Sequence, residues 1–112
     1  MLNAVVLVGR VGQDPDMKYF ESGKVKTTFS IAVNRWNSAA KKEIADWFYI
    51  EFCDKDAERA GEYVKKGRLV GIEGRLDMST WTDKEGNKRE NFFVRGSKFH
   101  FMGGKNEASS AD

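Results

Sequence analysis

Hydrophobic and polar residues alternate with a period of two along Asp46–Cys53, the segment D-W-F-Y-I-E-F-C. β-branched and aromatic residues dominate it, so the pattern predicts a β-strand. The face expected in the core holds Phe48, Ile50 and Phe52. The opposite face presents Trp47 and Tyr49 between polar groups. A soluble domain needs a reason to expose two large rings, so this face is a candidate binding surface.

Similar patterns predict four further strands and the turns between them. The strands are expected at Ala4–Val11, Val25–Asn34, Arg68–Met78 and Asn91–Met102. Met17–Phe20 is expected as a short extension of the first strand, and Thr80–Arg89 as the tip of a hairpin. Arg35–Ala45 is polar without a clear period, so we expect a flexible loop there.

Between the third and fourth strands the hydrophobic period changes from 2 to 3.6. Small residues recur on one side of Asp54–Lys66, which predicts a short helix packed closely on a sheet. Asp54 or Asp56 is expected to cap its start, and Gly67 to follow its end. Five strands with one short helix between strands 3 and 4 predict an all-β fold, the five-stranded Greek-key barrel called the OB-fold. We expect one domain over residues 1–104 and a short flexible tail over 105–112.

The composition narrows the class of function. The chain of 112 residues has a net charge of +2 and one cysteine, which fits a reducing compartment without disulfides. It has no apolar run long enough to span a bilayer, so no membrane partner is expected. It has no phosphate-binding loop, its single His100 has no nucleophile in a known motif, and one Cys and one His are too few for a zinc site. We therefore expect no enzyme, no catalytic residue, no metal and no cofactor.

Three tryptophans stand beside basic or turn residues, and this set indicates nucleic-acid binding. An exposed ring can stack on any base without reading its identity, while Lys and Arg neutralise phosphates. The candidate stacking residues are Trp36, Trp47, Tyr49 and Trp81. The candidate phosphate contacts are Arg10, Arg35, Lys55, Lys66, Lys88 and Arg89.

Five motifs occur in an order that resembles the bacterial-type single-stranded DNA-binding protein. They are L-V-G-R-V-G-Q-D-P-D-M-K-Y (7–19), D-W-F (46–48), E-Y-V-K-K-G (62–67), I-E-G-R-L (72–76) and W-T-D-K-E-G (81–86). The resemblance implies an OB-fold homotetramer that binds single-stranded DNA without sequence preference in replication, recombination and repair. It also implies a location in the bacterial cytoplasm with the nucleoid, or alternatively in a plastid or mitochondrion.

The sequence departs from the family pattern at three places. Cys53 and Asp54 stand where the family usually has an aromatic residue and a glycine, and Asp77 lies in a stretch that is often basic. After Gly104 the sequence also shows neither the linker nor the acidic tip that the resemblance implies for recruiting replication and repair proteins, so we expect this chain to lack that tail. An alternative function therefore stays open, that of a tail-less OB-fold replication adaptor of the primosomal type that acts mainly through protein contacts. A third possible function is that of a structural oligomer whose barrel is retained for assembly alone.

Overall fold

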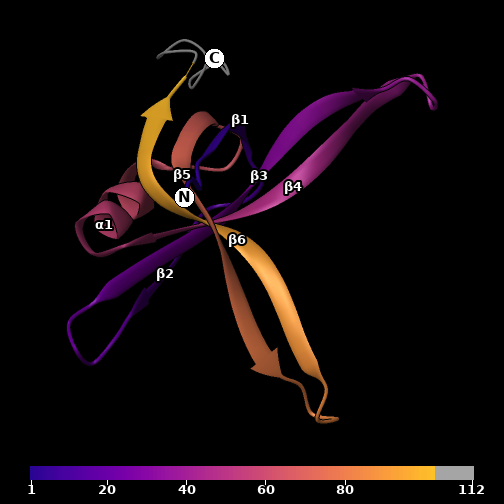
Figure 1. Cartoon of the computed structure of the whole chain (residues 1–112). Helices are drawn as coiled ribbons and strands as arrows, with labels where there is room; N and C mark the ends of the chain where they lie inside the picture. The colour runs from indigo at the N-terminus through magenta and orange to yellow at the C-terminus, as the bar shows by residue number, and fades with distance from the viewer. Residues whose placement is uncertain (103–112) are drawn as a thin grey trace.

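The computed structural model describes residues 1–102 as six strands and one helix (Figure 1). They are β1 (Val5–Val11), β2 (Asp16–Tyr19), β3 (Val25–Asn37), β4 (Lys42–Cys53), α1 (Asp54–Tyr63), β5 (Leu69–Thr82) and β6 (Lys88–Phe101). The strand order is β1-β5-β6-β4-β3-β2, and pairing of β1 with β3 closes five of the strands into a barrel. The predicted all-β barrel with one short helix is therefore confirmed. The predicted tail at 105–112 lies outside the described residues.

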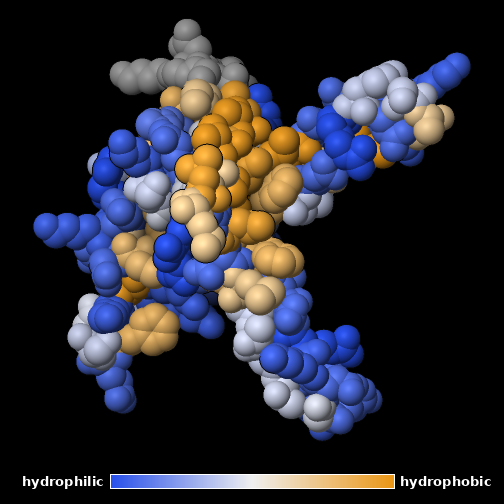
Figure 2. All heavy atoms as spheres, viewed as in Figure 1, coloured by the Kyte–Doolittle hydropathy of each residue, from blue (hydrophilic) through white to orange (hydrophobic). Residues whose placement is uncertain are grey.

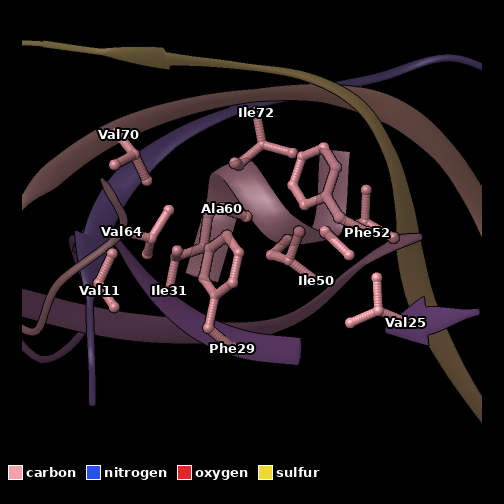
Figure 3. Close-up of a cluster of buried hydrophobic side chains, with 12 residues drawn as sticks. Val11, Val25, Phe29, Ile31, Ile50, Phe52, Ala60, Val64, Val70 and Ile72 are labelled. Carbon is pink, nitrogen blue, oxygen red and sulfur yellow. The ribbon is translucent and has the colours of Figure 1, made fainter. Parts of the chain in front are cut away.

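The core fills the barrel from alternate positions of the strands (Figure 3). On β4, Ile50 and Phe52 are buried while Trp47 and Tyr49 are exposed, as the alternation predicts. Phe52 is the centre of this core, because its ring stacks beside Phe29 with centroids 6.2 Å apart and meets Phe99 edge-on at 5.4 Å. The apolar face of the Asp46–Cys53 segment thus holds the barrel together, and the opposite face is left for solvent or a ligand.

Helix α1 closes one end of the barrel through very small side chains. Ala57 and Ala60 are fully buried, and Thr27 of β3 donates its hydroxyl to the carbonyl of Ala57 at 2.6 Å. At Gly61 the Met17 side chain lies so close to the helix that an added Cβ would overlap its sulfur. The stripe of small residues predicted from the sequence therefore allows the helix backbone to approach the sheet.

The predicted ends of the helix are wrong. Cys53 occupies the N-cap without a side-chain hydrogen bond, so neither Asp54 nor Asp56 caps the helix, although both lie in its first turn. The helix ends at Tyr63 rather than Lys66, because Val64 adopts an extended backbone and turns its side chain into the core. Burying this apolar side chain stabilises the fold more than one further helical turn of exposed lysines would.

The predicted flexible loop at Arg35–Ala45 is also wrong. Strands β3 and β4 continue through it as a paired hairpin, in register from Asn34↔Ala45 to Asn37↔Lys42. This hairpin projects beyond the barrel as an arm, at the upper right of Figure 1. Both of its faces are solvated, so it needs no hydrophobic alternation, and that is why the sequence pattern does not reveal it.

No helix among residues 1–102 is long and apolar enough to cross a membrane.

Candidate nucleic-acid interface

Two arms leave the barrel at one point and diverge. Strands β4 and β6 pair in parallel only at Ile50↔Val94 and Glu51↔Arg95. Beyond this point the β3–β4 and β5–β6 hairpins separate into a fork (Figure 1). At the root of the fork lies a groove of about 450 Å³ lined by residues of β3, β4, β5 and β6, and an adjoining hollow of about 320 Å³ shares Tyr49, Asn91 and Phe92 with it. We call this continuous space the fork groove.

Trp47 lines the fork groove, and the edge of its six-membered ring contacts the barrel at Gly12. Its ring lies over Gly12, where an added Cβ would come within 2.5 Å of the ring. The side chain nevertheless remains 61% exposed. A ring that is supported from behind and open in front loses little entropy when a base stacks on it, so the absence of a side chain at Gly12 prepares Trp47 for stacking.

Three of the predicted site residues share the outer face with Trp47. Directly opposite residues of antiparallel strands point to the same side, and Arg10, Ala32 and Trp47 lie opposite one another across β1, β3 and β4. Tyr49 lies two residues along β4 from Trp47 on this face, and Trp36 lies four pairs further out on the arm. At about 3.3 Å per residue, the rings of Trp36 and Trp47 are anchored roughly 13 Å apart.

Trp81 lies on the other arm, so the structure does not gather all four rings into one cluster. It is directly opposite Arg89, whose Nε donates to Asp83 Oδ2 at 2.9 Å. Asp83 also accepts hydrogen bonds from the turn amides of Glu85 and Asn87. These bonds, with the one from Arg89 as the largest cause, hold the pKa of the Asp83 carboxyl below its ordinary value. Asp83 thereby fixes the tip of the arm that carries Trp81.

The predicted phosphate contacts are spread over the molecule rather than concentrated. Arg35 donates to Asp46 at 2.7 Å, so this charge and that of Arg89 each stand beside a carboxylate. Arg10 donates to the carbonyl of Gly67, next to Lys66. The remaining members of the predicted set are exposed on α1 and at the start of β6, namely Lys55 and Lys88. This distribution of charges favours a nucleic-acid strand that passes over a wide surface and not one that binds in a single cleft.

Arg95 lies at the root of the fork and was not among the residues predicted from sequence. Its Nε donates to Asp77 Oδ2 at 2.9 Å, its Nη1 lies 3.4 Å from Glu51 Oε2, and Lys26 Nζ lies 3.8 Å from Glu51 Oε1. The bond from Arg95 is the main cause that lowers the pKa of Asp77, and Asp77 in turn raises that of Arg95. Although Asp77 departs from the basic family pattern, its negative charge on this face is paired with Arg95.

Cys53 lies next to Arg95, on the barrel side of the charged cluster formed by Arg95, Asp77, Glu51 and Lys26. Its side chain is half-buried, and its Sγ lies 3.8 Å from Arg95 Nη1. The next residue, Asp54, adopts a positive φ of 59°, a conformation that glycine favours and Asp tolerates. The two residues that depart from the family pattern thus keep the sharp entry into α1 but supply no ring at this end of the β4 face.

Phe92 is a second residue that sequence reasoning missed. It is 61% exposed and lines both parts of the fork groove opposite Tyr49. The available signal was the adjacent pair Phe92-Phe93 next to the polar hairpin tip, and neither ring belongs to the buried core. Placing Phe92 opposite β4 requires the parallel pairing of β4 with β6, which no local pattern encodes.

Comparisons with known proteins agree with this architecture. The Single-strand binding protein family matches residues 2–102. Single-stranded DNA-binding protein 1 of Nostoc sp. is 46% identical over 107 residues, covering 95% of this chain and 87% of that protein. Its counterpart in Synechocystis sp. is 44% identical over 111 residues, covering 98% and 91%.

A solved structure titled "Plasmodium falciparum SSB complex with ssDNA" has the same fold. It superposes with a TM-score of 0.82 at 28% identity and covers 91% of this chain and 96% of that one. The family match over residues 2–102 spans the barrel, the helix and both arms. On the family match and on the identity to its relatives, the chain belongs to the single-strand binding protein family.

Proposed function

We propose that this protein binds single-stranded DNA without overall sequence preference, in replication, recombination and repair. Bases stack on Trp36, Trp47, Tyr49 and Trp81, and phosphates contact Arg10, Arg35, Lys55, Lys66, Lys88 and Arg89. The observation that carries this proposal is the supported, exposed ring of Trp47 in register with Arg10. A base on that ring would have a cation about two strand spacings away, roughly 10 Å.

Competition between strand forms tests this function. A labelled single-stranded oligonucleotide bound to the protein should be displaced by unlabelled single strands, and far less by the same sequence as a duplex, whose bases are already stacked. An adaptor of the primosomal type would bind neither form measurably at low salt. Equal displacement by both forms would contradict the stacking mechanism, since it would mean that only the phosphate backbone is recognised.

Replacing Asp77 with Asn should tighten DNA binding. The amide keeps the shape beside Arg95 but removes the charge that neutralises it, so Arg95 becomes available to a phosphate. Each added phosphate contact should steepen the slope of log affinity against log salt by about 0.7. Oligonucleotide titrations at several salt concentrations measure this. The exposed Glu58 on α1 offers a control, Glu58→Gln, that removes an equal charge away from the groove.

We also propose that four copies assemble into a homotetramer, around which DNA wraps. The support is an unusually apolar outer surface on β1, where Val6 and Val8 are 72% and 46% exposed. Figure 2 shows an apolar strip over the middle of the molecule, in the region where β1 and β5 lie in Figure 1. Among the described residues, β1 pairs with β3 only at Arg10 and Val11, so the edge of its first half is open to a strand from another copy.

Replacing Val6 with Lys should break this assembly. A lysine on each copy would bring like charges together at a surface that must be desolvated, whereas the monomer would tolerate it because Val6 is exposed. Sedimentation should show a shift from four chains toward smaller species, with the monomer still folded. Ser22→Lys in the exposed turn before β3 is the control. An unchanged mass for the Val6 variant would place the interface elsewhere.

Other replication or repair proteins are also proposed as partners, and the relatives in cyanobacteria favour a bacterial cytoplasmic location with the nucleoid.

A further inference from the structure

Glu51 is a carboxylate with unused capacity to accept hydrogen bonds. Its side chain is only 17% exposed, yet its two cationic neighbours lie at 3.4 Å and 3.8 Å. Arg95 instead makes its short contact, 2.9 Å, with Asp77. An ionised carboxylate offers about four acceptor positions. Two long contacts therefore leave oxygen lone pairs available to a donor that enters the groove.

The position of Glu51 matches where the edge of a stacked base would lie. It is two residues along β4 from Tyr49, on the same face, so the two side chains start about 7 Å apart. Both line the fork groove of about 450 Å³, whose other wall carries Phe92 and Phe93. This volume falls within the range of small-molecule sites. A base whose ring contacts Tyr49 would direct one edge toward Glu51 and the two cations beside it.

We infer that Glu51 gives the fork groove a preference for a base that carries an exocyclic amino group, with cytosine favoured over uracil or thymine. The inference rests on the proposed DNA binding and adds a base preference at one position. The amino group of cytosine donates to the carboxylate, and its ring nitrogen and carbonyl accept from cations such as Arg95 and Lys26. Uracil and thymine present a carbonyl oxygen at the same place, which the carboxylate repels.

This preference is compatible with binding that is otherwise indifferent to sequence. Trp36, Trp47 and Trp81 offer π-faces, which every base can use. Among the ion pairs of residues 1–102, Glu51 is the one carboxylate that two cations flank. One selective position in a longer contact biases affinity for a homopolymer but does not define a recognition sequence. The expected difference in affinity between homopolymers is therefore modest.

Oligomers of deoxycytidine and deoxyuridine test the inference, because the two bases are equal in size and neither carries the 5-methyl group. At neutral pH and equal length, the wild-type protein should bind the cytosine strand at least about fivefold more tightly, the low end of discrimination by a base-edge contact. In Glu51→Gln the amide can donate to the uracil carbonyl, and the ratio of the two affinities should fall to about one. Removing a negative charge should raise affinity for both strands, so the ratio is the quantity that decides.

Two controls separate this effect from charge and from folding. Glu43→Gln removes the same charge further out on the same face of β4, and it should leave the ratio at its wild-type value. A strand of N4,N4-dimethylcytosine has no amino hydrogen to donate, and it should bind the wild-type protein no better than the uracil strand. Equal wild-type affinities, an unchanged ratio in Glu51→Gln, or full binding of the dimethylated strand would each overturn the inference. Failure of all strands to bind would instead overturn the proposed function.

Discussion

Replacing Trp47 with Ala is expected to weaken binding of an oligothymidine by about 1–3 kcal/mol, a loss of about 5- to 150-fold. Trp47 combines support from Gly12, an exposed ring face and a place in register with Arg10. Truncation removes the stacking of one base, while the other rings and the cations keep their contacts, so the loss is that of a single stacked base. Fluorescence anisotropy of a labelled oligonucleotide at fixed salt measures the change directly.

The matched variants for Trp47 isolate stacking from general loss of surface. Trp47→Phe keeps a ring over Gly12 and should retain part of the affinity. Tyr19→Ala removes an aromatic side chain that is 70% exposed on β2, away from the fork, and should leave affinity nearly unchanged. If Trp47→Ala binds as tightly as the wild type while Tyr19→Ala does not, the binding face has been assigned to the wrong side of the barrel.

Replacing Phe52 with Ala is expected to lower the free energy of unfolding by about 3–5 kcal/mol, as large-to-small changes of buried aromatic residues do. The ring is fully buried, contacts Phe29 and Phe99, and lies directly over Gly96, where even a Cβ would overlap it. The backbone of β6 and the aromatic neighbours cannot all collapse into the vacated space. Chemical denaturation followed by far-ultraviolet circular dichroism gives the value.

The control for Phe52 is the exposed phenylalanine of the same sheet. Phe92→Ala should change the free energy of unfolding by no more than about 0.5 kcal/mol, the usual range for surface positions. Similar losses for both variants would contradict the assignment of Phe52 to the core and Phe92 to the groove.

The strand Asp46–Cys53 and its two faces could be predicted from sequence because its pattern is local. The period of two places Ile50 and Phe52 inside and Trp47 and Tyr49 outside whatever the rest of the chain does. The barrel could be predicted from the order of such elements. The paired hairpin at Arg35–Ala45 could not be predicted from sequence, because both of its faces are solvated and its pairing leaves no hydrophobic pattern.

The root of the fork could not be predicted because it depends on contacts between distant segments. Arg95 meets Glu51 and Asp77 only through the parallel pairing of β4 with β6 and the antiparallel pairing of β5 with β6. From sequence, Asp77 was an acidic departure from the family pattern, and nothing linked it to Glu51. In the structure both carboxylates pair with Arg95. Asp77→Asn is therefore expected to make Arg95 available to a phosphate, in addition to relieving repulsion.

Tryptophan fluorescence during titration with oligothymidine tests the central claim, that the exposed tryptophans on the arms and at the root of the fork stack on the bases of single-stranded DNA. Emission should be strongly quenched, since stacking places a base against each ring, and the apparent affinity should fall as salt rises because phosphate contacts release counterions. Unchanged emission at low salt, with the barrel intact by circular dichroism, would contradict the claim.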